Sequence, residues 1–215
     1  MNRVTIVPLQ PANLQAAAAA LAKAFHDDPL QSYVFPDPKE RAAKSPAHFS
    51  PLLAYGLRFG RVFTSDPRPL GVSIWLPPDG WEVTPERAAE AGLDRLPELL
   101  GQASADRFFS VLAYADAFHK RDVPPAHWYT MILGVAPEGQ GRGLGRALMQ
   151  PILTVAATDG LPCYLETAQP SNVSFYKHLG FQVVRESVEP TSKLKLWTFR
   201  RDPRPREPGR DDCIP

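Results

Sequence analysis

The segment from His127 to Gly145, HWYTMILGVAPEGQGRGLG, constrains the fold more than any other part of the chain. Up to Val135 it is rich in β-branched and aromatic residues, which favour a strand, and Pro137 ends that strand because proline cannot donate to a β-ladder. Glycines follow at alternate positions, and an apolar stripe that begins at Ala147 is typical of a helix. The segment therefore predicts a strand, a glycine-rich loop and a helix.

A helix that begins in a glycine-rich loop favours the binding of an anion. The N–H groups of its first turn have no partner within the helix, and the helix dipole places partial positive charge there. A P-loop would need Lys-Ser or Lys-Thr after the last glycine, whereas Arg146 and Ala147 follow Gly145. A dinucleotide-binding fingerprint would need G-x-G-x-x-G, whereas the spacing here is G-x-G-x-G. We therefore expect a phosphate-binding loop of another kind.

Two linked motifs indicate which kind. Gln140, Gly143 and Gly145 match Q/R-x-x-G-x-G/A, the acetyl-CoA signature of the GCN5-related N-acetyltransferases (GNAT superfamily). Downstream, the segment from Leu161 to Phe181 resembles the fifth strand and fourth helix of that family, including its N-x-x-x-Y-x-x-x-G-F run. The strings VPPAHWY, LET and SFYKHLGF further resemble the branch that includes puromycin N-acetyltransferase.

The resemblance implies an α/β fold: a mixed, mostly antiparallel twisted sheet with helices on both faces and a V-shaped opening for acetyl-CoA. It implies acetyl-CoA-dependent transfer of an acetyl group to a primary amine of a small molecule, directly in a ternary complex. Two alternatives stay open. One is a non-catalytic acyl-CoA-binding regulatory module, and the other is an acetyltransferase that acts on a peptide or protein amine.

The resemblance also assigns a cosubstrate site. The expected acetyl-CoA contacts are Leu133, Gly134, Val135, Gln140, Gly141, Arg142, Gly143, Leu144, Gly145, Arg146, Asn172 and Tyr176. The end of the central strand would offer backbone groups to the pantetheine and the thioester carbonyl, and such a donor stabilises an oxyanion. An ordinary glycine turn is the alternative for the loop, and a helix N-cap is the alternative for Asn172.

Two side chains are candidates for the chemistry. Tyr176 matches the family tyrosine near the sulfur and would protonate the departing thiolate, unless it is only a packed aromatic. Glu166 lies at the end of a predicted strand and would take a proton from the incoming ammonium, unless its role is a structural hydrogen bond. His26, Asp27, Asp28 and Tyr33 could line the acceptor pocket, with Asp28 and Tyr33 as the substrate-binding candidates. An aspartate before proline is equally typical of a turn.

Composition limits the partners. Lys and Arg number 24 against 23 Asp and Glu, so no whole-protein field favours nucleic acid or an anionic membrane. The two cysteines, Cys163 and Cys213, provide neither a disulfide framework nor a zinc spacing. No signal sequence or membrane span is evident. We expect a cytoplasmic protein without a metal, a monomer or homodimer, that uses acetyl-CoA and a small-molecule amine.

Hydrophobic periodicity and turn signals predict the other elements. Strands are expected at Arg3–Pro8, Arg61–Ser65, Leu70–Leu76, Cys163–Thr167, Phe181–Val188 and Leu194–Phe199. Helices are expected at Pro11–Phe25, Lys39–Phe59 (broken or bent near Pro46 and Pro51), Trp81–Leu100 (interrupted at Gly92 and Pro97), Asp106–Lys120 and Asn172–Leu179. His26–Pro38 is expected to be a loop, because its prolines stop helices. One domain should span residues 1–200, and the charged, proline-rich sequence from Arg200 onward predicts a disordered tail over residues 201–215.

Overall fold

The computed structural model describes residues 4–203 and contains a seven-stranded open sheet with strand order β1-β2-β3-β4-β5-β7-β6. All neighbouring strands are antiparallel except β4 and β5, which are parallel. The strands are β1 (Thr5–Pro8), β2 (Arg61–Asp66), β3 (Gly71–Leu76), β4 (Trp128–Val135), β5 (Cys163–Thr167), β6 (Gln182–Val188) and β7 (Lys195–Arg201). The mixed, mostly antiparallel sheet expected from the sequence is confirmed.

The parallel pair β4 and β5 opens into a V. The two strands pair only at Trp128 with Cys163 and at Tyr129 with Tyr164, although β4 continues to Val135. On its other edge β4 pairs with β3 as far as Val135, with a bulge at Met131 where the register shifts. A bulge increases local twist and re-aims neighbouring groups. The second half of β4 therefore presents to the opening an edge that β5 does not pair.

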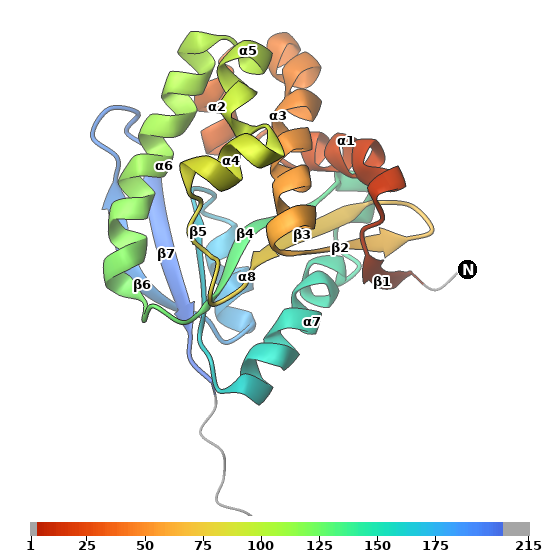
Figure 1. The fold of residues 1–215 in the computed structure, drawn as a ribbon, viewed down its shortest axis with the longest axis vertical. Helices are drawn as coiled ribbons and strands as arrows, with labels where there is room; N and C mark the ends of the chain where they lie inside the picture. Colours follow the sequence, from red (N-terminus) through yellow and green to blue (C-terminus); the bar gives the residue numbers. More distant parts are fainter. Residues whose placement is uncertain (1–3, 204–215) are drawn as a thin grey trace, which may run out of the picture.

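Helices cover both faces of the sheet (Figure 1). One face carries α1 (Leu14–Ala24), α2 (Pro29–Val34), α3 (Pro38–Phe59), α4 (Pro85–Ala91), α5 (Leu96–Leu100) and α6 (Gln102–Asp122). The other face carries α7 (Leu144–Asp159) and α8 (Asn172–His178). Short 3₁₀ turns lie at Pro11–Asn13, Leu93–Arg95 and Pro137–Gly139. The insertion between β3 and β4 supplies α4, α5 and α6, so it covers the face on which the V opens.

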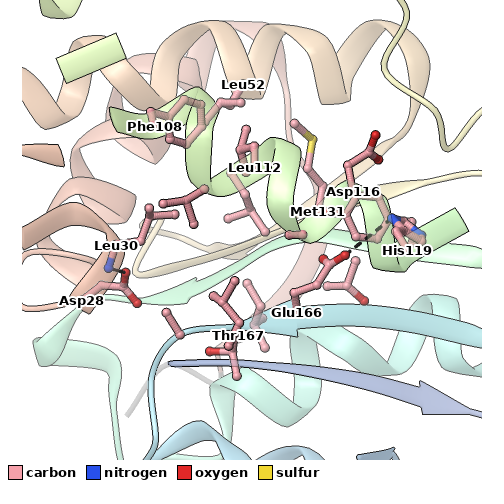
Figure 2. Close-up of a pocket in the computed structure, with 18 of the residues that line it drawn as sticks. Asp28, Leu30, Leu52, Phe108, Leu112, Asp116, His119, Met131, Glu166 and Thr167 are labelled. Carbon is pink, nitrogen blue, oxygen red and sulfur yellow. Dashed lines mark hydrogen bonds and ion pairs between the residues drawn. The ribbon is translucent and has the colours of Figure 1, made fainter. Parts of the chain in front are cut away.

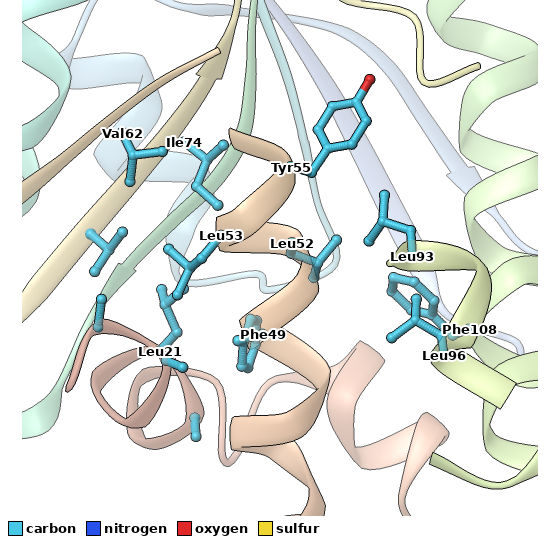
Figure 3. Packing of buried hydrophobic residues seen from close by; sticks show 14 of the residues in the cluster. Leu21, Phe49, Leu52, Leu53, Tyr55, Val62, Ile74, Leu93, Leu96 and Phe108 are labelled. Carbon is cyan, nitrogen blue, oxygen red and sulfur yellow. The ribbon is translucent and has the colours of Figure 1, made fainter. Parts of the chain in front are cut away.

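Each helical layer has its own apolar core. Figure 3 shows the first core, in which Leu21 of α1, Phe49 and Leu53 of α3, and Phe108 of α6 pack with Ile74 of β3. The second core lies under α7 and α8 and contains Trp75, Trp128, Met149, Ile152, Leu153, Cys163, Leu165, Tyr176, Phe181, Trp197 and Phe199. Burial of such side chains contributes roughly 1.5 to 3 kcal/mol each. These two cores fix the strands around the V from both sides.

The long helix α6 is also fastened to the edge of the sheet. Arg185 of β6 donates from Nε and Nη2 to the two oxygens of Asp122, at 2.7 and 2.6 Å, a bidentate pairing that restricts both side chains. The same guanidinium lies over the ring of Phe118 at 4.6 Å, and the Tyr114 hydroxyl donates to the Val188 carbonyl at 3.1 Å. These contacts fix α6 against β6, so that α6 covers this part of the sheet.

The prediction of a loop from His26 to Pro38 is wrong, because this segment contains the helix α2. Oδ1 of Asp28 accepts from the backbone N–H groups of Leu30 (2.9 Å) and Gln31 (3.4 Å), and Pro29 occupies the first helical position. Proline is well suited to that position, since its missing N–H has no partner there in any case. Asp37 and Pro38 begin α3 in the same way. An aspartate before proline here starts a helix.

Other elements also differ from expectation. α4 begins only at Pro85, after the cap Thr84, so Trp81 lies outside it, and α6 begins at Gln102 rather than at Asp106. α3 runs unbroken through Pro46 and Pro51. β7 includes Arg200 and Arg201, which pair with Tyr164 and Cys163 of β5, so the ordered chain extends past the expected start of the tail. The remainder of that expected tail, residues 204–215, lies outside the described residues.

Candidate active site

The glycine-rich loop joins the end of β4 to α7. Gly141 and Gly143 adopt positive φ values of 71° and 74°, a conformation that favours glycine, and a Cβ built at either position meets nothing within 4 Å. Among the described residues, no hydrogen bond is formed by the N–H groups from Gly141 to Arg146. Consecutive free donors at the start of a 16-residue helix are an anion-binding arrangement. The side chains of Arg142 and Arg146 are exposed beside it.

Two further glycines allow close packing beside this loop. A Cβ at Gly134 would lie 2.7 Å from Cε2 of Phe25, so α1 can approach β4 only because this position is glycine. A Cβ at Gly145 would lie 3.2 Å from Cζ of Phe175, which brings α8 against the first turn of α7. The Gln140 amide donates to the Val135 carbonyl at 2.9 Å, so this side chain fixes the loop to the end of β4.

A cavity of about 520 Å³ lies between the V of the sheet and the helices α2, α3 and α6 (Figure 2). That volume is within the range of small-molecule sites, roughly 300 to 1,000 Å³. Of the residues expected from the sequence, Asp28, Leu133, Glu166, Asn172 and Tyr176 line it, whereas Tyr33, Gly134, Val135 and the loop residues from Gln140 to Arg146 do not. The sequence-based candidates from four separate segments are thus brought to one place.

Asn172 and Tyr176 reach the cavity from α8. The Asn172 amide donates to Oγ1 of Thr167 at 3.4 Å, and the cap position of α8 is Ser171, so the N-cap alternative for Asn172 is wrong. Tyr176 is buried against Phe181 and Phe199, and its hydroxyl has no hydrogen-bond partner among the described residues. Burial, reinforced by the nearby Asp28 carboxylate, raises the pKa of Tyr176 well above its usual value. Its phenol therefore keeps its proton across the working pH range.

Glu166 projects from β5 beneath α6, and its side chain is only 14% exposed. Burial raises the pKa of Glu166 to about 8, a contact with the Tyr129 hydroxyl lowers it, and the nearby Asp116 carboxylate raises it further. A carboxylic acid that titrates near physiological pH is matched to proton exchange with an amine. Burial and like charge, the same two causes, are typical of functional acids.

A pair of buried histidines adjoins Glu166. Nδ1 of His127 lies 2.6 Å from the Pro124 carbonyl oxygen, and Nε2 of His127 lies 2.8 Å from Nε2 of His119. Burial lowers the pKa of both rings, that of His119 to about 3, so both are neutral. A carbonyl only accepts, so His127 donates from Nδ1 and accepts at Nε2, and His119 must then donate from Nε2. The unprotonated Nδ1 of His119 therefore faces Oε1 of Glu166, 3.5 Å away.

Sequence reasoning did not identify this pair. His119 lies in the inserted helix α6 and His127 lies just before β4, so no spacing rule relates them to Glu166. The only available signal was the presence of His127 at the start of the central segment. The Tyr164 ring stacks on His119 at 4.2 Å and the Trp81 ring packs against it at 4.3 Å, which excludes water from the pair.

Other chemistries have weaker support. Cys163 is buried, and burial raises the pKa of its thiol to about 12, so it is not an activated nucleophile. Within residues 4–203, no group of three or more His, Cys, Asp and Glu side chains is arranged to hold a metal ion. None of the helices in the same part of the chain is both long and apolar enough to cross a membrane.

Comparison with known proteins identifies the class. The model of the acetyltransferase (GNAT) family matches residues 73–181, which include β4, the glycine-rich loop, β5 and α8. The chain therefore belongs to the GNAT family of acetyltransferases, enzymes that use acetyl-CoA as cosubstrate. An uncharacterised N-acetyltransferase of Schizosaccharomyces pombe is 30% identical over 201 residues, which cover 87% of this chain and 78% of the relative.

The solved structures that resemble this chain support the fold. A Corynebacterium glutamicum protein described as histone acetyltransferase HPA2 and related acetyltransferase has a TM-score of 0.68 at 21% identity, covering 94% of this chain and 97% of that one. The Drosophila melanogaster polyamine N-acetyltransferase, which forms N-acetylagmatine, has a TM-score of 0.56 at 17% identity, covering 93% and 100%. At these identities the likeness establishes the fold alone.

Proposed function

We propose that the protein transfers the acetyl group of acetyl-CoA to a primary amine of a small molecule, directly in a ternary complex. The observation that carries the proposal is the cavity that joins Glu166 and Tyr176 at the unpaired edge of β4. Its volume suits a small acceptor, and the buried thiol of Cys163 is unsuited to a covalent acetyl intermediate. Two of the solved structures with a similar fold are an agmatine N-acetyltransferase and an arylalkylamine N-acetyltransferase of Aedes aegypti, and both are named for small amines.

The chemistry divides between two residues. Glu166 removes a proton from the bound ammonium, and the free amine attacks the thioester carbonyl carbon. A backbone N–H on the unpaired edge near Leu133, Gly134 and Val135 stabilises the oxyanion. The C–N bond forms, the C–S bond breaks, Tyr176 gives its phenolic proton to the departing sulfur, and the second proton of the attacking nitrogen passes to the tyrosinate and restores the phenol. The free N–H groups from Gly141 to Arg146 bind the CoA pyrophosphate, with Arg142 and Arg146 beside it and Asn172 near the pantetheine.

Several narrower statements belong to the same proposal. Asp28 lines the cavity itself, whereas Tyr33 acts through α2. The strings VPPAHWY and SFYKHLGF support a place near puromycin N-acetyltransferase. We also propose one domain over the described residues and a cytoplasmic location.

Acetylation of a peptide amine is the second candidate function. It is favoured by the mycobacterial N-alpha-acetyltransferase RimI, which is 30% identical over 95 residues that cover 43% of this chain and 60% of that protein.

An amine screen tests the activity. Purified protein, acetyl-CoA and single amines are mixed, and release of the CoA thiol and formation of the acetylated amine are followed together. We expect equal amounts of both products with at least one small amine. Binding of acetyl-CoA by calorimetry without turnover on any amine or peptide would instead favour the non-catalytic alternative.

The phosphate site is tested by a charge-only comparison at Gly143. Asn and Asp have the same shape and both tolerate a positive φ, so Gly143→Asn and Gly143→Asp share the steric change. Only the aspartate brings a negative charge to the free N–H groups, so we expect it to weaken CoA binding about a hundredfold more than asparagine. Calorimetric affinities for CoA measure the difference. Equal affinities in the two folded variants would contradict the assignment of this loop.

A further inference from the structure

The charged groups that line the cavity are all acidic. The described lining residues include four carboxylates, on Asp28, Glu82, Asp116 and Glu166, and no lysine or arginine. Figure 2 shows Glu166 and Asp116 close to His119, whereas Asp28 lies at the opposite end. Oδ1 of Asp28 already accepts from the backbone N–H groups at the start of α2. The region of Glu166 and Asp116 is therefore the natural place for the cationic amine.

The part of the cavity lined by α3 and the first half of α6 is mainly apolar, whereas Gln31, Thr130, Thr167 and Asn172 line it elsewhere. Leu52, Phe108 and Leu112 lie in the upper part of Figure 2, and Leu30 lies near Asp28. His48 also lines the cavity, and burial lowers its pKa to about 4, so it adds no charge. A second cation placed beside Leu52, Phe108 and Leu112 would lose its hydration without a charged partner, which is unfavourable.

The apolar lining continues to the surface. Phe109 and Leu112 of α6 both line the cavity and are each 40% exposed, so they form an apolar patch at its mouth. Exposed apolar groups beside a cavity mark a surface that a ligand covers. Asp116 lies one turn further along α6 and is also exposed.

We propose that the acceptor is a primary amine carried on an apolar body, such as an arylalkylamine, rather than a diamine or a guanidinium-bearing amine. Its ammonium lies between Glu166 and Asp116, and its apolar body lies between Phe108, Leu112 and Leu52. The assignment rests on the proposed acetyl transfer, of which it names the acceptor class.

Two amines of similar length separate the classes. Phenylethylamine carries a ring where agmatine carries a guanidinium, and a short peptide with a free N-terminus tests the protein class. We expect kcat/KM for phenylethylamine to exceed that for agmatine at least tenfold and to exceed that for the peptide. A preference for agmatine, the peptide or another amine of the screen overturns the acceptor class but leaves acetyl transfer standing, whereas no acetylation of any amine in the screen overturns both.

Variants at Leu112 test the location. Leu112→Asp and Leu112→Asn remove the same apolar side chain from a half-exposed position, so both should fold, which a melting curve checks. Only the aspartate offers a partner for a second cation, so we expect the ratio of kcat/KM for phenylethylamine to that for agmatine to fall at least fivefold further in Leu112→Asp than in Leu112→Asn. Equal ratios in the two variants overturn the placement of the apolar body beside Leu112.

A second inference concerns the histidine pair. The geometry points to His119 and His127 as positioning residues that favour the protonated form of Glu166 once it has taken the proton of the ammonium. His127 accepts from Nε2 of His119, which leaves the bare Nδ1 of His119 toward Oε1 of Glu166, where it favours the protonated acid over the carboxylate. Without that acceptor, His119 could carry its proton on Nδ1 and donate to the carboxylate instead.

Other groups also face this pair and Glu166, and they stay unchanged in the test. Asp116 of α6 faces Glu166, as do Tyr129 of β4 and Tyr164 of β5. His119 additionally faces Lys120 and the Trp81 ring. A shift that depends only on the acceptor at position 127 is therefore distinguishable from their background effects.

The infrared band of the protonated Glu166 carboxyl, identified by its loss in Glu166→Gln, reports the titration without any amine. We compare wild type, His127→Gln, which keeps an acceptor, and His127→Leu, which does not. The midpoint should stay within about 0.3 pH units in His127→Gln and fall by about one unit or more in His127→Leu. His119→Phe also removes the lone pair and should lower the midpoint if His127→Leu fails to fold. An unchanged midpoint in the folded variant that lacks the acceptor or the lone pair overturns the inference.

Discussion

Replacing Glu166 with glutamine should lower kcat/KM by about 10² to 10⁴, the usual contribution of a general base. Glutamine keeps the size of the side chain and accepts a hydrogen bond from Tyr129, yet it cannot take a proton from the ammonium. Binding of acetyl-CoA should change little, because the loop proposed to bind its phosphates follows β4, whereas Glu166 lies on β5. Steady-state kinetics on the best amine, with calorimetry for CoA, measure the two effects separately.

The pH dependence gives an independent check. Because the pKa of Glu166 is raised to about 8, the carboxylate fraction grows as pH rises through that value, and kcat/KM of the wild type should rise with it. In Glu166→Gln, the pH profile of kcat/KM should retain only the change that comes from deprotonation of the amine itself. A variant that keeps the wild-type midpoint and more than a tenth of the activity would make Glu166 a structural residue.

Stability should show the opposite trend. The folded pKa of Glu166 lies above its ordinary value of 4.5, so the fold favours the neutral acid. That contribution is fully present below about pH 4.5 and is lost as pH rises through about 8. Relative to wild type, Glu166→Gln should therefore gain melting temperature at pH 9 and show little difference at pH 4.5. No relative gain at high pH would mean that Glu166 is not strained by burial.

The conformation of the glycine-rich loop was predictable because its signal is local. Gly141 and Gly143 have positive φ values, and the spacing of glycines between an apolar strand and an apolar helix needs no distant partner. The same holds for the β4 and β5 strands, whose composition alone indicates a buried sheet. Local sequence thus defined the cosubstrate side of the candidate site.

The acceptor side depends on contacts that no local pattern contains. The inserted helix α6 brings Leu112, Asp116 and His119 over Glu166, and its place is fixed by the pairing of Asp122 with Arg185 far along the chain. The failure at α2 had a different cause. Pro29 follows the capping residue Asp28, and a proline in that position starts a helix. The sequence analysis instead treated the prolines of this segment as helix breakers.

Tyr176→Phe should lower kcat by about 10² to 10⁴ while leaving the affinity for CoA nearly unchanged. The substitution removes one hydroxyl and keeps the ring against Phe181 and Phe199. Since that hydroxyl has no hydrogen-bond partner among the described residues, its removal should hardly change the melting temperature. The loss of turnover would then come from the missing proton donor for the sulfur.

The pH profile and a second tyrosine make the Tyr176 test decisive. Because burial raises the pKa of Tyr176 well above its usual value, the phenol does not titrate in the assay range, and the loss should be the same at every pH. Tyr55 is another buried tyrosine, in the core on the other face of the sheet, so Tyr55→Phe makes the same chemical change away from the cavity. Turnover of Tyr176→Phe within about threefold of Tyr55→Phe would assign the ring to packing alone, and the thiolate would then take its proton from water.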